Sequence, residues 1–199
     1  MPFSFSRLAS AFRRPALAVA IAASPMAPVH AAPIPVAIVA TAAPRRKVSG
    51  RLVAGTALAT LCCGTLQTFE GTKLETYRDV VGIPTACTGE TKGIRMGMRF
   101  TRTECDAMLL KRLTEDFAPA MERCARQPMG DDLYAAHLSL AYNIGTGGYC
   151  KSSVVRLWNQ GDRRASCQAF MLYDKAGGRV IAGLVKRRQA ERAMCLKGV

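Results

Sequence analysis

Apolar residues recur at helical spacing through the second half of the chain. Four that share one helix face follow Asp132: Leu133, Ala136, Leu140 and Ala141. Their spacing predicts a buried helix that ends at Gly145, with His137 as a core or rim residue of that helix. Glycines divide the remaining sequence into three further predicted helices, over residues 153–159, 162–172 and 182–195. The pattern favours a mainly helical fold.

A further helix is predicted to begin at Arg102. Thr101 and Glu104 have the spacing of a capping box, in which each side chain satisfies a backbone N–H group of the other residue. Pro119 is expected to bend or restart the chain, because proline cannot donate the backbone hydrogen bond that an uninterrupted helix needs.

The helical pattern breaks after Glu70. Gly71 can end a helix at this point. Beyond it, turn-forming residues separate two short β-branched stretches, at residues 80–81 and 83–85. We expect these stretches to form a small β-hairpin that carries Asp79 and Thr85. The predicted fold class is therefore α+β, mainly α, with Glu70 at a helix end beside the hairpin.

Glu70 and Asp79 are candidates for a pair of catalytic carboxyl groups. Glycoside hydrolysis needs one carboxyl to protonate the leaving oxygen and a second to act on water or on the developing positive charge. Residues nine apart on one continuous helix would lie on opposite faces. The predicted turn at Gly71 therefore matters, because it allows both groups to face one site.

The run from Glu70 to Thr91 resembles the catalytic segment of the phage-type lysozymes, glycoside hydrolase family 24, which includes T4-like and lambdoid enzymes. Their pattern is Glu, eight residues, Asp, five residues and Thr, and it falls here on Glu70, Asp79 and Thr85. The resemblance continues through residues 141–147 and 183–192, so it covers about the last two thirds of the chain. It departs at Glu90, where many relatives carry histidine.

The resemblance implies a lysozyme-like fold and hydrolysis of the β-1,4 bond between N-acetylmuramic acid and N-acetylglucosamine in peptidoglycan, without a metal or organic cofactor. Glu70 would be the general acid, and Asp79 with Thr85 would position or activate the attacking water. An arginine of the family pairs with the catalytic glutamate, and Arg187 matches it by order, as an orienting residue. Asn143 would either bind a sugar group of the substrate or cap the end of its own helix.

Charge is distributed unevenly along the chain. It carries 28 Lys and Arg against 14 Asp and Glu, and all the acidic residues lie at Glu70 or later. A positive protein suits an anionic wall polymer. A noncatalytic cationic protein that disrupts walls or membranes is the alternative function. Nucleic-acid binding is not expected, because aromatic stacking clusters and a recognisable binding motif are missing from the sequence. The enzyme is expected to be a monomer.

The first 69 residues are predicted to serve export rather than catalysis. Residues 1–47 form a basic, signal-like leader with an apolar stretch, although this part is also consistent with an overextended gene start. Residues 48–69 contain an uncharged stretch of 18 residues, from Leu52, which is just long enough to span a bilayer. In the phage lysozymes such a segment resembles a signal anchor that is later released, so we expect a periplasmic or inner-membrane-tethered protein. The alternative is an ordinary buried helix leading into a catalytic domain at residues 70–199.

Cysteine usage agrees with export. Eight cysteines without a Cys-x-x-Cys pair, and only two histidines, argue against a zinc site. Six of the cysteines lie in the presumed catalytic domain and allow fifteen pairings, of which the simplest joins sequence neighbours: Cys87 with Cys105, Cys124 with Cys150, and Cys167 with Cys195. Cys62 and Cys63 lie in the presumed anchor, where a thiol switch is a second hypothesis beside simple packing.

Overall fold

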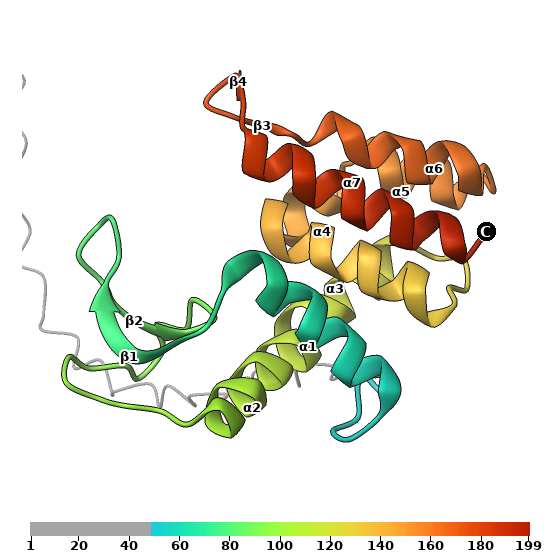
Figure 1. Cartoon of the computed structure of the whole chain (residues 1–199). Coiled ribbons are helices and arrows are strands. Elements are labelled where there is room, and N and C mark those ends of the chain that lie inside the picture. Colours follow the sequence, from blue (N-terminus) through green and yellow to red (C-terminus); the bar gives the residue numbers. More distant parts are fainter. Residues whose placement is uncertain (1–48) are drawn as a thin grey trace, which may run out of the picture. The chain divides into compact units, whose positions relative to one another are not determined.

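The computed structural model describes residues 49–199 (Figure 1), so the leader expected at residues 1–47 lies outside the described residues. Seven α-helices occur in this part of the chain: α1 (Ala57–Glu70), α2 (Arg102–Arg112), α3 (Ala118–Cys124), α4 (Asp131–Cys150), α5 (Ser153–Asn159), α6 (Arg163–Ala169) and α7 (Ala182–Lys197). Two antiparallel hairpins join them, made of β1 (Lys73–Arg78) with β2 (Pro84–Cys87) and of β3 (Lys175–Ala176) with β4 (Arg179–Val180). The α+β, mainly α fold class is confirmed.

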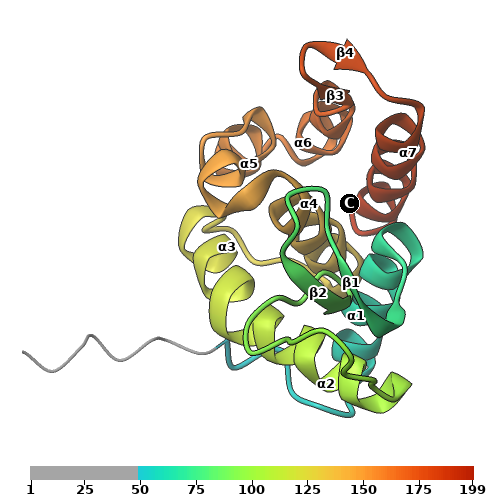
Figure 2. The same cartoon turned by 90° about the vertical axis from the view of Figure 1, so that its left-hand side faces the viewer.

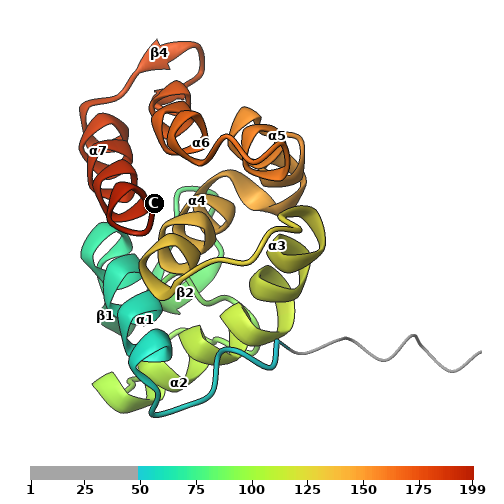
Figure 3. The same cartoon turned by 90° about the vertical axis from the view of Figure 1, so that its right-hand side faces the viewer.

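Helix α4 is the centre of the helical part. It packs against α1, α3 and α7, and Figures 2 and 3 show these helices around it. Its residues from Leu133 to Ala141 are all buried, as the apolar spacing predicted. The helix breaks at Gly145, which has a φ of 77° and a ψ of 152°, and helical turns then continue to Cys150. The predicted end at Gly145 is thus a kink, made where glycine alone adopts the backbone angles easily.

Helix α1 belongs to the same compact unit as the residues that follow it. Leu58, Cys62 and Leu66 are at most 6% exposed and lie in the main hydrophobic core with residues of α4. In the folded structure α1 therefore packs as part of the same core as the helices that follow residue 70, and the division into an anchor segment and a catalytic domain stays a prediction. Among residues 49–199, no helix is both long and apolar enough to cross a membrane.

The β1–β2 hairpin forms where it was expected, but its first strand differs from the prediction. The strand is residues 73–78, while Val80 and Val81 lie exposed in the turn. The reason is Asp79, whose Oδ1 accepts hydrogen bonds from the N–H groups of Val81 and Ile83 and so bends the chain. Three residues of β1 oppose one residue of β2 between the pairs Lys73–Cys87 and Tyr77–Thr85, a bulge that bends the strand.

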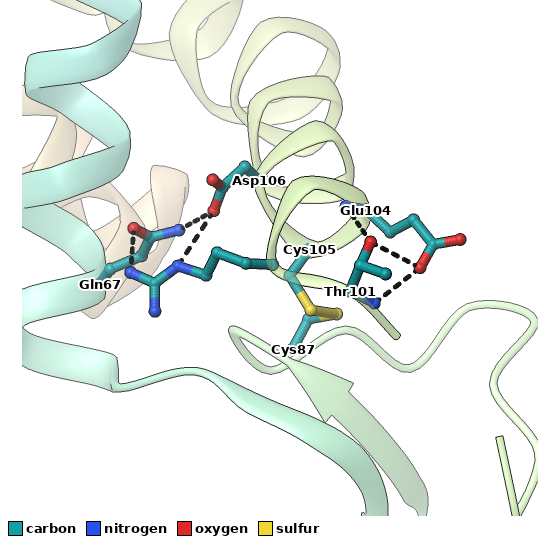
Figure 4. Close-up of a disulfide and its surroundings, with 7 residues drawn as sticks. Gln67, Cys87, Thr101, Glu104, Cys105 and Asp106 are labelled. Atoms are coloured by element: carbon teal, nitrogen blue, oxygen red, sulfur yellow. Dashed lines mark hydrogen bonds and ion pairs between the residues drawn. A yellow bond between two sulfur atoms is a disulfide. The ribbon is translucent and has the colours of Figure 1, made fainter. Parts of the chain in front are cut away.

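Helix α2 begins at Arg102 with the predicted capping box. Thr101 Oγ1 accepts from Glu104 N–H, and the Glu104 carboxylate accepts from Thr101 N–H at 2.7 Å (Figure 4). The helix continues into a π-helical turn over Leu113–Phe117, followed by α3. Ala118 N–H reaches back five residues to Leu113 O directly before Pro119, which cannot donate. The proline therefore restarts the helix through a widened turn, as expected of a residue without a backbone N–H group.

The two helices after α4 match their predicted ranges, whereas the last hairpin was not predicted. Residues 153–159 form α5, and α6 continues into a 3-10 turn at Phe170–Leu172. The sequence between Lys175 and Val180 was read only as a glycine break, yet it forms the short β3–β4 hairpin. Gly177 and Gly178 both have positive φ, which a two-residue hairpin turn requires.

Three disulfides pair the cysteines that are neighbours in sequence, as the simplest assignment predicted. They are Cys87–Cys105, Cys124–Cys150 and Cys167–Cys195. The first ties β2 to α2 and lies in a small core of its own (Figure 4). The free thiols lie on α1, where burial raises the pKa of Cys62 to about 12 and of Cys63 to about 11. Both are therefore protonated and unreactive while α1 is packed.

Candidate active site

Glu70 is the last residue of α1 and faces α7. Gly71 ends the helix with a φ of 72° and donates its N–H group to Gln67 O. Glu70 Oε1 accepts a hydrogen bond from Arg187 Nη1 at 2.6 Å, and the pair crosses 117 residues of sequence. The Glu70 side chain keeps 32% of its surface exposed, whereas Arg187 keeps 5%. Glu70 is therefore oriented by a buried cation and still open to a ligand.

Arg187 is fixed by acceptors on two helices. Its Nε donates to Glu191 Oε1 at 3.0 Å, one turn along α7, and its Nη2 donates to Ser139 O on α4 at 3.1 Å. The ring of Phe69 lies 4.9 Å from the guanidinium carbon. All three guanidinium nitrogens thus donate hydrogen bonds, which leaves Arg187 little freedom to move away from Glu70.

A second buried arginine extends this network. Arg188, which is fully buried, donates from Nη2 to Glu191 Oε1 and to Asn143 Oδ1, at 3.1 and 3.0 Å. Burial lowers the pKa of Arg188 to about 10, against the opposing effect of Glu191, so the guanidinium stays charged at neutral pH. Two glutamates, Glu70 and Glu191, thus face two guanidinium groups within one cluster.

This network was only partly foreseen from the sequence. Arg187 was expected to orient Glu70, whereas no role was expected for its neighbour Arg188, and both side chains are buried. Glu191 and Ser139 were missed, although Glu191 lies four residues from Arg187, a spacing at which helical side chains meet. Asn143 Oδ1 accepts a hydrogen bond from Arg188 Nη2, so this side chain supports the buried network, and its contact with a sugar group stays a prediction.

Asp79 and Thr85 both form hydrogen bonds with the backbone of Ile83 at the turn of the β1–β2 hairpin. Asp79 Oδ1 accepts from Ile83 N–H at 2.8 Å, and Thr85 Oγ1 donates to Ile83 O at 3.0 Å. Asp79 Oδ2 has no hydrogen-bond partner among residues 49–199. Thr85 is 4% exposed and lies opposite Tyr77 across the hairpin. The pair therefore offers one free carboxylate oxygen and one fixed hydroxyl.

Tyr142 joins the two sides of the site and was not predicted. It lies on α4, and its hydroxyl donates to Thr88 O, directly after β2, at 2.8 Å. Burial raises the pKa of Tyr142, and the neighbouring Arg112 opposes this shift. The tyrosine therefore stays protonated beside Glu70 and ties the hairpin to the central helix.

Glu90, where the resemblance expects histidine, holds the loop after the hairpin. Its Oε2 lies 3.9 Å from Arg112 Nη1, and the same Arg112 atom donates to Gly89 O at 3.0 Å. The loop is thereby connected to α2. Within residues 49–199 no hydrogen bond or ion pair joins Glu90 to Glu70, Asp79 or Thr85, so its role here is to support the loop.

The arrangement supports acid and base chemistry by two separate carboxyl groups. No hydrogen bond joins Glu70 to Asp79 or Thr85 within the described part of the chain. Glu70 lies at the end of α1, whereas Asp79 and Thr85 lie at the turn of the hairpin. In residues 49–199 no group of three or more His, Cys, Asp or Glu side chains could hold a metal ion. A mainly helical fold with one carboxyl at a helix end and a second on an adjoining hairpin agrees with the lysozyme-like fold that the sequence resemblance implied.

Comparison with known proteins identifies the family. The sequence pattern of the Phage lysozyme family matches residues 67–191, and the chain belongs to that family. It is 36% identical over 130 residues to the SAR-endolysin of Enterobacteria phage P21, covering 65% of this chain and 78% of the relative. It is 34% identical over 148 residues to the SAR-endolysin of Pseudomonas phage phiKMV, covering 72% and 90%. A crystal structure of a P22 lysozyme mutant superposes with a TM-score of 0.64 at 30% identity, covering 75% of this chain and 98% of that one.

Proposed function

We propose that this protein is an endolysin that hydrolyses the β-1,4 bond between N-acetylmuramic acid and N-acetylglucosamine in bacterial peptidoglycan. One observation carries the proposal: Glu70, half-exposed at the end of α1, is held by the buried Arg187, while Asp79 and Thr85 are fixed at the hairpin turn. Membership of the phage lysozyme family supports the same reaction.

Glu70 is the general acid in this mechanism. Its carboxyl donates a proton to the glycosidic oxygen as the bond to the anomeric carbon breaks. The free Oδ2 of Asp79 accepts a proton from the attacking water, and the Thr85 hydroxyl, which donates to Ile83 O, keeps its lone pairs toward that water. The water oxygen then bonds to the anomeric carbon and gives a product with a reducing end.

Arg187 serves as a positioning residue. It holds Glu70 Oε1 in one orientation and leaves the rest of the carboxyl group toward the exposed side. No metal or organic cofactor is required, because both steps are proton transfers coupled to bond cleavage. The enzyme acts as a monomer.

The relatives named SAR-endolysins support export of this chain through its N-terminal part. In this proposal residues 48–69 tether the protein to the inner membrane before release into the periplasm. Because Leu58, Cys62 and Leu66 are core residues in the folded structure, the tethered and folded forms use the same side chains and exclude each other. Catalysis thus follows release.

Clearing of purified peptidoglycan tests the reaction, with the parent beside a Glu70→Gln variant. The substitution keeps the shape of the side chain and removes the proton donor, so the rate should fall by about 10²- to 10⁴-fold. Mass spectrometry of the parent's products should show reducing muramic ends. Anhydro ends would instead indicate a lytic transglycosylase.

Glu75→Gln provides the matched control. Glu75 lies on β1 and its side chain is 69% exposed, paired only with the exposed Arg99. The Glu75→Gln variant should retain the parent's clearing rate, because it removes a carboxylate of the same hairpin that is not part of the proposed site. Equal clearing by the parent and by Glu70→Gln would favour the noncatalytic cationic alternative.

A further inference from the structure

A concave surface between α3 and α5 carries only positive charge. It forms a pocket of about 600 Å³ lined by four basic side chains: Arg123, Arg126, Lys151 and Arg156. No aspartate or glutamate lines it. Other pockets of the described chain differ, since the neighbouring one contains Glu122 and one beside α2 mixes three acidic with three basic residues.

The four cations are not neutralised by the protein. None of them takes part in an ion pair within residues 49–199, whereas the buried arginines of α7 are paired with glutamates. Within the described part of the chain, the one side-chain hydrogen bond that these four side chains make joins Arg156 to the neutral Gln160. All four side chains are exposed. Four unpaired positive charges around one hollow repel each other, and an anionic ligand would relieve this repulsion.

The backbone beneath these side chains is rigidly connected. The Cys124–Cys150 disulfide joins α3 to the end of α4 within the pocket wall. Asn159 on α5 accepts from Arg126 N–H at 2.8 Å and donates to Cys124 O at 2.8 Å. Figures 2 and 3 show α3 and α5 side by side. The cations are therefore held on one surface by covalent and hydrogen-bonded links.

This surface adjoins the point where the described chain begins. Ser49 Oγ donates to Glu122, the residue before Arg123, and Arg51 lines the neighbouring pocket together with Arg126. The 48 residues that precede Ser49 contain six basic residues and no acidic residue. A chain that reaches the membrane through its N-terminal part would bring this cationic surface close to the lipid headgroups.

We infer that Arg123, Arg126, Lys151 and Arg156 form a docking surface for the phosphate groups of anionic phospholipids at the membrane. Three of the four are arginines, whose planar guanidinium matches two phosphate oxygens at once. The orientation toward a membrane rests on the proposed export of the chain, while the binding itself does not depend on hydrolysis. The surface would keep the folded enzyme near the bilayer after α1 has joined the core.

Vesicle sedimentation with the full chain tests this inference. The pocket variant combines Arg123→Gln, Arg126→Gln, Lys151→Gln and Arg156→Gln. The control combines four exposed cations that do not line the pocket, as Arg95→Gln, Lys175→Gln, Arg179→Gln and Lys197→Gln. Both lose the same charge, so any difference between them belongs to the surface. Thermal unfolding of both variants checks that the fold is retained.

The pocket variant should bind vesicles of phosphatidylcholine with phosphatidylglycerol at least about tenfold more weakly than the control, because each cation near an anionic membrane contributes about fivefold. Vesicles of phosphatidylcholine alone should bind both variants equally. Equal weakening of both variants on anionic vesicles would overturn the inference in favour of general charge. Weakening confined to purified peptidoglycan would assign the surface to the wall. Displacement by inorganic phosphate at constant ionic strength, without a preference for anionic vesicles, would reduce it to a free phosphate site.

Discussion

At the scale of single residues, the site depends on charges that are buried and balanced. Glu191 is fully buried, and its Oε1 accepts from Ser139 Oγ at 2.6 Å as well as from Arg187 and Arg188. Burial raises the pKa of Glu191, and the two guanidinium groups oppose this shift. Glu191 therefore helps to hold Arg187 in the position from which it binds Glu70.

Replacing Glu191 by glutamine should be strongly destabilising. The amide keeps the shape but removes the charge, which leaves two buried guanidinium groups with Glu70 as their one remaining carboxylate. Breaking a buried ion pair in this way costs about 3–5 kcal/mol. Urea unfolding measures the loss. Glu75→Gln breaks an exposed pair on β1 and should change the free energy of unfolding by less than about 1 kcal/mol; comparable losses would show that burial does not matter here.

His137 should make the protein less stable in mild acid. It is completely buried, and desolvation lowers its pKa to about 3 from the ordinary 6.5. Between these values the unfolded chain binds a proton that the folded chain rejects. The free energy of unfolding should therefore decrease as the pH falls from 6.5 toward 3, by about 1.4 kcal/mol per pH unit.

A His137→Gln variant isolates this effect. Its glutamine can still bond to the Tyr149 hydroxyl, which shares a hydrogen bond of 2.6 Å with His137 Nδ1. The free energy of unfolding, measured between pH 6.5 and 4.5, should fall less steeply for the variant than for the parent. Parallel slopes would mean that His137 is protonated in the folded state.

At the scale of elements, the junction between α1 and β1 places the acid relative to the hairpin. Gly71 has a φ of 72° and a ψ of 177°, a conformation that residues with a Cβ atom rarely adopt. The chain can therefore leave the helix directly after Glu70 and start β1 three residues later, at Lys73. The bulge of β1 then bends the strand toward the turn that carries Asp79.

Replacing a glycine by alanine should have opposite effects at the junction and within α1. Gly71→Ala should destabilise the protein by about 1–3 kcal/mol through backbone strain, and should lower the clearing rate because Glu70 lies beside the strained bond. Gly64→Ala, within α1, meets no atom within 4 Å and should stabilise the protein by about 1 kcal/mol through helix propensity. Thermal unfolding of the two variants makes the comparison, and a stabilising Gly71→Ala would remove the argument for strain.

Local signals made several elements predictable. The capping box fixed the start of α2 at Arg102, and helical spacing with flanking glycines gave the range of α5. The first strand was placed wrongly because the run Lys73–Arg78 is mostly polar, while the β-branched Val80 and Val81 occupy the turn. The short β3–β4 hairpin was missed for a similar reason, since two-residue strands carry too little pattern to recognise.

The candidate residues of the site were predictable from family resemblance, but their supports were not. Glu70, Asp79, Thr85 and Arg187 follow from the order of a motif along the chain. Ser139, Glu191 and Tyr142 depend on which faces of α4 and α7 meet, and that is decided by tertiary packing. A charged residue in a basic helix reads as solvated until the partner helix that buries it is known.

At the scale of the whole molecule, α1 connects the site with the core. Its C-terminal residue is the proposed acid, and its apolar face packs into the same core as α4, α3 and α7. The segment that precedes it is also held, because Arg51 donates to Met129 O and to Asp131, at 3.0 and 3.1 Å. The folded unit therefore begins well before the catalytic motif.

This argument predicts how truncation will act. A chain that begins at Ser49 keeps Leu58, Cys62 and Leu66 in the core and should unfold cooperatively. A chain that begins at Glu70 lacks all three, each worth about 1.5–3 kcal/mol when fully buried, and this sum approaches the whole stability of an ordinary domain. Circular dichroism during heating should show a sharp transition for the first chain and none for the second. A cooperative transition in the shorter chain would show that residues 70–199 fold as a domain without α1, and that packing of the helix is not needed for that fold.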